Sequence, residues 1–238
     1  MSYGITIYSS LDTIQISDAT LNSRMFLGGS SSYSSTEGHH AYINMPYNVK
    51  EEPPVVLVRP SVAESYVGAV MVLKNDSYYY AGQNGAYGRI RILGQAAFSW
   101  AVFSTRGVAI ADNELYGLNV FSSTGQLSFS SNHRQARIMS LHYRPPYSAG
   151  NWPRSFSISG HTQMPWIIAN PLTVTWYGVG DLSENLGCLM AKINSSYSAL
   201  TVELGDAAGG PLKVLPASFR NQDPYRGRPF WIGVGSYA

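Results

Sequence analysis

The chain has 238 residues, of which 45% are hydrophobic and only 13% charged, and its formal net charge is +2. The hydrophobic share is ordinary for a globular protein and excludes a disordered chain, while the small charge without a basic run argues against nucleic acid as the main partner. The single cysteine, Cys188, leaves no intrachain disulfide and no cysteine-based metal site.

The first predicted element is a β-hairpin. The opening "MSYGITIYSS" has neither a basic segment nor an apolar core, so it is not a signal peptide. Apolar and polar residues alternate over residues 3–17, as they do in strands with one buried face. A Ser- and Gly-rich stretch follows, and we expect "TEGHH", residues 36–40, to be a mobile surface loop or a subunit contact. No apolar run approaches the roughly 20 residues that span a bilayer.

Short apolar or alternating runs, separated by turn residues, fill the rest of the chain. Convincing helices are absent, because the best helical candidate, residues 190–204, has the turn-forming centre "NSSYS" and reads as two strands. This pattern predicts an all-β fold of the sandwich or barrel type. The predicted strands lie within residues 54–60, 68–73, 88–93, 99–104, 154–160, 165–171, 172–179, 188–193, 199–204 and 229–235.

A second hairpin, residues 116–131, resembles the first. Aligned without gaps, residues 3–24 and 116–137 share six identities in 22 positions, and five further pairs are similar apolar residues. The matched apolar positions are two apart in each strand, which places them on one face of the hairpin. Gly125 permits the positive φ of a tight turn, whereas Asp12 at the matching place tolerates it less well.

A second correspondence lies downstream at a nearly equal offset. Prolines flank the runs "VVLVR" and "WIIAN", which are 111 residues apart, while the hairpins are 113 apart. Two correspondences in the same order predict an internal duplication, with coincidence among strands of biased composition as the alternative. We therefore expect two β-sandwich-like halves, residues 1–111 and 112–238, that pack together.

The second hairpin also resembles one found in bacteriophage tail proteins. That hairpin carries Tyr-Gly-Leu, an apolar-polar-aromatic strand, a glycine turn and a strand ending in Phe-Ser-Ser, often after a "W-x-V-F" strand like "SWAVFS" here. The resemblance covers residues 99–138 and, more weakly, the first 25, where the turn departs from the pattern. It implies a virion tail location and carries over no catalytic residue. The matching residues are Tyr116, Gly117, Leu118, Val120, Phe121, Gly125, Leu127, Phe129, Ser130, Ser131, Arg134 and Arg137.

No constellation of residues predicts catalysis or metal binding. Glu37, His39 and His40 could hold a metal, but adjacent side chains on an extended segment point opposite ways. Ser159 and His161 are close in sequence, which does not make a triad, and no Gly-x-Ser-x-Gly motif accompanies them. The acidic residues are scattered, several of them in turns, so an enzyme on glycans ranks low. We expect no enzyme, no metal and no cofactor.

Aromatic residues cluster in two predicted loops. Tyrosine and tryptophan stack on sugar rings, and they also anchor protein interfaces. Both interpretations stay open at this point, with subunit contact favoured over glycan binding. The residues concerned are Tyr78, Tyr79, Tyr80, Tyr87, Tyr143, Tyr147 and Trp152.

The sequence thus predicts a non-enzymatic structural protein of the tail tip, baseplate or fibre attachment. It would be made in the host cytoplasm and would bind other tail subunits in the virion as a symmetric homo-oligomer. The alternative is a receptor-binding module that recognises glycan on the host surface.

Overall fold

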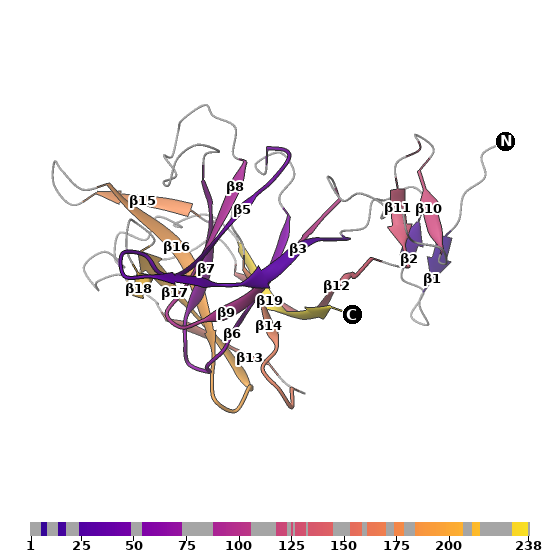
Figure 1. Cartoon of the computed structure of the whole chain (residues 1–238). Coiled ribbons are helices and arrows are strands. Elements are labelled where there is room, and N and C mark those ends of the chain that lie inside the picture. The colour runs from indigo at the N-terminus through magenta and orange to yellow at the C-terminus, as the bar shows by residue number, and fades with distance from the viewer. Residues whose placement is uncertain are drawn as a thin grey trace.

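Every regular element that the structure describes is a β-strand (Figure 1), which confirms the predicted all-β fold. The structure is a computed structural model. It describes residues 6–8, 14–17, 24–48, 54–72, 88–105, 118–122, 125, 127–131, 133–144, 153–158, 161–169, 174–178, 184–206, 211–214 and 230–237. None of these residues belongs to a helix that is long and apolar enough to cross a membrane.

One large sheet has six antiparallel strands in the order β12-β19-β14-β6-β9-β3. Valine, isoleucine and aromatic residues dominate its inner strands, as the predicted apolar runs require. The strands are β3 (Arg24–Ser30), β6 (Val55–Pro60), β9 (Phe98–Ser104), β12 (Ala136–Arg144), β14 (Trp166–Ala169) and β19 (Phe230–Tyr237).

The second sheet has nine strands, seven of which follow the order β13-β17-β16-β7-β8-β5-β4, while β15 pairs with β16 and β18 with β17. Its strands are β4 (Ser32–Ser34), β5 (Gly38–Asn44), β7 (Val67–Val72), β8 (Arg89–Gly94), β13 (Arg154–Ser157), β15 (Val174–Gly178), β16 (Glu184–Ile193), β17 (Ala199–Asp206) and β18 (Lys213–Val214).

The main core lies between the two large sheets, so the body is a β-sandwich. Successive side chains of β6 point to opposite faces of the sheet. Val56 and Val58 enter the core between the sheets, while Leu57 belongs to an apolar cluster on the opposite face. A third cluster contains Cys188, whose side chain is fully buried. Burial raises the pKa of the Cys188 thiol to about 12, as expected of a structural cysteine.

Strands from both sides of the predicted boundary at residues 111 and 112 meet in each large sheet. β6 pairs with β14 in the first sheet, and β7 pairs with β16 in the second. The main core also takes residues from both sides, including Val56 and Val102 from the first half and Ile167 and Val234 from the second. The two halves are therefore joined along both sheets and share one core. The predicted boundary itself lies outside the described residues.

The halves have matching strand order and register. From the centre of the six-stranded sheet outward, β6, β9 and β3 correspond to β14, β19 and β12. At the centre Leu57 pairs with Ile168, while Val56 and Val58 pair with Ala169 and Ile167. If 111 is added to each β6 residue number and subtracted from each β14 residue number, the same three residue pairs result. Common ancestry of the halves stays a prediction.

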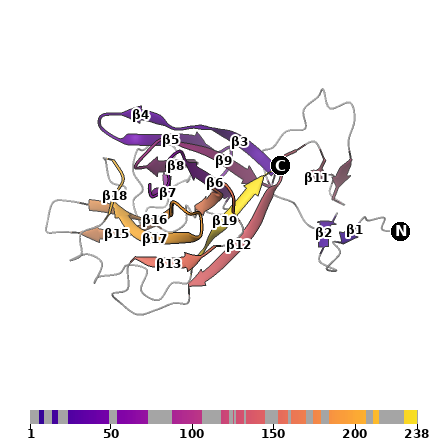
Figure 2. The same ribbon diagram turned by 90° about the horizontal axis from the view of Figure 1, so that it is seen from below.

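The two predicted hairpins are present and have the same register. β1 (Thr6–Tyr8) pairs with β2 (Ile14–Ser17), and β10 (Asn119–Phe121) pairs with β11 (Leu127–Ser130). Adding 113 to each pair of the first hairpin gives the pairs of the second, and the β-bulge falls at the matching step. Both hairpins lie side by side beyond one end of the sandwich (Figures 1 and 2).

Local details of the second hairpin agree with the sequence analysis in part. Gly125 has a φ of 77°, which confirms the turn predicted there. Val120 and Leu127 are buried and Phe129 is half-buried, as the shared apolar face predicts. Leu118 is instead 44% exposed, so the prediction that its side chain belongs to the inward face was wrong.

The expected loop at residues 36–40 is part of a hairpin. β4 and β5 pair directly, with Ser34 opposite Gly38, so the expectation of a mobile surface loop was wrong. Gly38 has a φ of 69°, a left-handed conformation that glycine adopts without steric cost, and it ends the tight turn that the Ser- and Gly-rich sequence makes here.

Candidate interaction surface

The aromatic residues that the sequence singled out fall in parts of the chain where the structure gives no side-chain contacts. Tyr143 is in strand β12, where its backbone pairs with that of Trp231. The other predicted positions lie outside the described residues. They are Tyr78, Tyr79, Tyr80, Tyr87, Tyr147 and Trp152.

Exposed apolar side chains gather instead on one continuous stretch of chain that leads from the second hairpin into β12. Their exposed fractions lie between 43% and 59%, which is high for large apolar residues. We call this stretch the apolar edge; its residues are Leu118, Phe121, Ile138, Met139 and Leu141.

Two structural features expose the β12 side chains. β12 is the last strand of its sheet, and among the described strands only β19 pairs with it. A β-bulge interrupts the register between Ile138 and Ser140, so Met139 is an extra residue without a partner on β19. Ile138 and Met139 are consequently both more than half exposed. An edge strand with these side chains has free backbone groups and apolar surface for another chain.

The opposite edge of the same sheet is built differently. β3 also has an exposed leucine, Leu27, but two glycines follow it where β12 has bulky residues. The indole of Trp100 packs over this segment, and its Nε1 donates a hydrogen bond to the carbonyl of Ser30 at 3.2 Å. The β3 edge therefore offers less apolar surface than the β12 edge.

The two edges meet at the hairpin end of the sheet. The backbone N–H of Met25, on β3, donates a hydrogen bond to the carbonyl of Arg134 at 2.9 Å. The guanidinium of Arg134 also lies 5.6 Å from the centre of the Tyr237 ring. The backbone hydrogen bond joins β3 to the chain just before β12 begins.

The charged residues on the chain segment that carries the apolar edge have one sign. Residues 118–144 contain three arginines and neither aspartate nor glutamate. Arg134 and Arg137 are both exposed, on either side of the start of β12. A partner that covers this region would therefore be favoured by an apolar centre with acidic residues at its rim.

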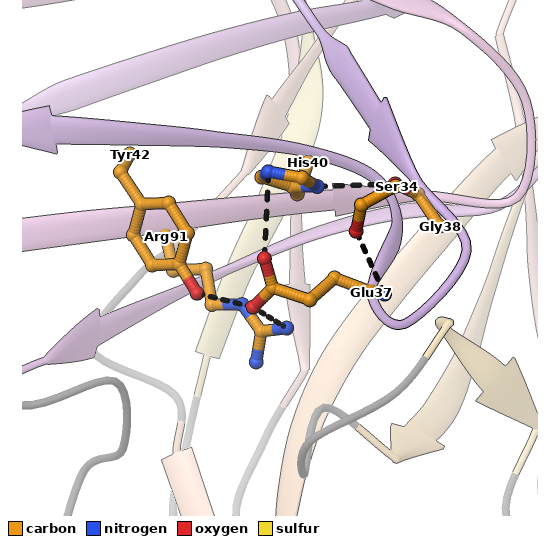
Figure 3. A network of polar contacts seen from close by, with 6 residues as sticks. All are labelled: Ser34, Glu37, Gly38, His40, Tyr42 and Arg91. Carbon is orange, nitrogen blue, oxygen red and sulfur yellow. Dashed lines mark hydrogen bonds and ion pairs between the residues drawn. The ribbon is translucent and has the colours of Figure 1, made fainter.

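A separate polar network fixes the β4–β5 hairpin to β8 (Figure 3). Glu37 Oε1 accepts hydrogen bonds from the Tyr42 hydroxyl at 2.6 Å and from Arg91 Nη2 at 3.1 Å. Glu37 Oε2 lies 3.4 Å from His40 Nε2, and the backbone N–H of Glu37 donates to Ser34 Oγ at 3.0 Å. Arg91 is fully buried, so pairing with Glu37 offsets part of the cost of burying its charge.

This network is structural in character. Desolvation, followed by the hydrogen bond to Glu37, raises the pKa of Tyr42 to about 12, so its hydroxyl keeps its proton at neutral pH. Both oxygens of Glu37 are engaged, and among the described residues no group of three His, Cys, Asp or Glu side chains could hold a metal ion. His39 packs against the Tyr33 ring in a tilted arrangement and His40 packs edge-on against the Tyr42 ring, and contact with different rings is expected for neighbours on a strand.

Sequence reasoning missed the apolar edge because it did not predict β12 as a strand. The signal was present in "RIMSLHY", residues 137–143, where apolar residues recur with roughly period two around the bulge. No family model, curated protein or solved structure matches this chain, so its function has to be inferred from these surfaces.

Proposed function

We propose that this chain is a structural subunit of a bacteriophage tail, at the tail tip, the baseplate or the fibre attachment. It works through protein–protein contacts made by the apolar edge, in symmetric copies within the virion. The proposal assigns no catalytic residue and no cofactor. The tail location rests on the resemblance of residues 99–138 to tail-protein hairpins.

The observation that carries the proposal is the exposed apolar side chains of β12. Ile138, Met139 and Leu141 lie on β12, an edge strand that pairs only with β19 among the described strands, and their exposed fractions are 59%, 54% and 43%. A soluble protein that works alone usually protects such an edge with charge, proline or a covering loop. An assembly subunit gains from leaving it open, because a strand of a neighbouring chain can extend the sheet while its side chains cover the apolar ones.

The low charge of the chain fits this mode of contact. Only 13% of the residues are charged, so few ion pairs are available to join subunits. Contacts of apolar residues and backbone hydrogen bonds are weakened little by salt, whereas exposed ion pairs are screened. Assembly through the apolar edge should therefore persist at high ionic strength.

The test is incorporation into virions of the phage that encodes the chain. Leu141→Lys places a charge on the β12 edge, where we expect incorporation, measured by immunoblot of purified virions, to fall severalfold. Leu27→Lys is the matched control, since Leu27 is similarly exposed at 48% on the opposite edge of the same sheet. Immunogold labelling should place the wild-type protein on the tail.

Two outcomes would overturn the proposal. The first is absence of the wild-type protein from purified virions. The second is normal incorporation of a doubly charged variant, Ile138→Lys with Leu141→Lys, that keeps the wild-type thermal midpoint.

A further inference from the structure

A cavity of about 400 Å³ lies on the face of the six-stranded sheet that points away from the second sheet, beside β14, β19 and β12. This volume falls within the range of roughly 300–1,000 Å³ that is usual for small-ligand sites. The lining combines aromatic, cationic and uncharged polar side chains, chiefly Arg59, His161, Gln163, Trp166, Ser236 and Tyr237.

A glycine opens this cavity. Trp166 on β14 pairs with Gly235 on β19, and at the matching place of the first half Val55 pairs with Phe103. The Phe103 ring is fully buried and fills its place, whereas Gly235 has no side chain. A Cβ on Gly235 would lie 2.5 Å from the carbonyl oxygen of Arg137, so the approach of β12 requires a glycine here.

Arg59 supplies a positive charge to the cavity. Its guanidinium lies 4.7 Å from the centre of the Trp166 ring, and no ion pair or side-chain hydrogen bond joins it to any residue that the structure describes. A guanidinium carries its N–H groups at its rim, in a fork that can bind a carboxylate in bidentate fashion.

The remaining lining groups suit a ligand with several hydroxyls and one apolar face. Within the described part of the chain, neither His161 nor Gln163 makes a side-chain hydrogen bond, so both are available to a ligand. Thr162 is also on the rim and is exposed. Met139 and Tyr237 also line the cavity and can provide apolar contact.

We infer that this cavity binds a carboxylated sugar residue, such as a uronic acid, with Arg59 holding the carboxylate. No aspartate or glutamate is found among the described residues that line the cavity, which favours an anionic ligand over a neutral or cationic one. A single arginine matches one carboxylate, while amide, imidazole and hydroxyl groups match ring hydroxyls. This site differs from the predicted aromatic loops, and it does not depend on the proposed assembly role.

Saturation-transfer NMR and calorimetry on the whole chain test the inference with three probes. Methyl β-glucuronide should bind, while methyl β-glucoside, which has the same ring without the carboxylate, should bind at least about tenfold more weakly because one charge-assisted pair is lost. Inorganic phosphate should not displace the glucuronide at equal concentration.

Arg59→Gln removes the charge and should weaken glucuronide binding by about tenfold or more. Arg89→Gln is the matched control, because Arg89 also stacks on an aromatic ring, that of Tyr42, outside the cavity. If Arg59→Gln does not fold, Gln163→Ala, at an exposed position, should lower the affinity for both sugars.

Three results would overturn the inference: no glucuronide binding to the wild-type chain, equal binding of the two sugars, or full displacement by phosphate. The last would indicate a simple anion site. A loss of binding that is equal in Arg59→Gln and Arg89→Gln would also contradict it. None of these results bears on incorporation into virions.

Discussion

The two halves of the sandwich have matching strand order and register, but they differ in their surface features. In both halves a hairpin leads into an edge strand, and the pairing across the sheet follows the same register, including a bulge at the second position after the shared arginine, Arg24 or Arg137. Past this bulge the strands differ: the first half has Gly28 and Gly29 under Trp100, and the second has exposed Leu141.

This difference teaches which positions the fold constrains. The pairs at the centre of the six-stranded sheet are aliphatic in both halves, because they enter the common core or the cluster behind it. The edge strands and the cavity carry no such requirement, so one half has surface features that the other lacks. The second half thus holds the apolar edge and most of the cavity lining, to which the first half adds Arg59.

The largest effect is expected when the first half is produced without the second. Residues 1–111 alone would expose β6 and β7 as new edges and remove the second-half side of the core. We expect this fragment to self-associate or aggregate, with no cooperatively unfolding monomer. Light scattering after size-exclusion chromatography and thermal denaturation measure this. A stable monomeric fragment would contradict the shared core.

The next largest effect concerns the position that Phe103 fills in the first half and that Gly235 leaves open in the second. Phe103→Ala should lower the free energy of unfolding by about 3–5 kcal/mol, since it empties a fully buried position. Phe121→Ala is the control, because that ring is 47% exposed and its loss should change stability by less than about 0.5 kcal/mol. Urea denaturation measures both, and equal losses would contradict the assigned packing.

A smaller effect should follow from the polar network that only the first half's β4–β5 hairpin makes with Arg91. Glu37→Gln removes the ion pair between Glu37 and the buried Arg91 guanidinium and should destabilise the chain by about 1–3 kcal/mol. Glu64→Gln, in the exposed pair with Lys192, should cost less than about 1 kcal/mol. If the two substitutions cost the same, the network is no stronger than a surface pair.

The smallest effect is a pH dependence in the same hairpin. The pKa of Tyr42 is raised from 10.0 to about 12 in the folded chain, first by burial and then by the bond to Glu37. Below pH 10 the hydroxyl is protonated in both states. As pH rises from 10 to about 12, only the unfolded chain ionises, so the free energy of unfolding falls. Tyr42→Phe should make this fall shallower, whereas Tyr33→Phe, at an exposed position, should not.

Much of the strand pattern was predictable from local signals. The apolar runs mark β6, β7, β8, β9, β14 and β19, and the turn at Gly125 follows from the backbone freedom of glycine. The offsets of 111 and 113 residues also appear in the strand pairings. These features depend on residues near one another in sequence, which periodicity can detect.

What could not be predicted depends on contacts far apart in sequence. Nothing in the runs around Leu57 and Ile168 indicates that they pair with each other and join the halves. The cavity arises because a glycine on β19 faces Trp166 and Arg59 lies over the indole, three elements that only the tertiary fold brings together. The prediction of a loop at residues 36–40 was wrong because that segment belongs to a hairpin, which the ion pair between Glu37 and Arg91 stabilises.

The buried thiol of Cys188 gives the seam between the halves a built-in chemical reporter. Its sulfur lies 3.3 Å from the place of a Cβ on Gly68, where β16 runs beside β7, and it is the chain's single cysteine. Because Cys188 is fully buried in a cluster with residues such as Tyr66 and Leu212, a thiol-specific dye can reach it only when these surroundings open. The rate of labelling under native conditions would therefore report how often this part of the molecule opens, without the introduction of any foreign label site.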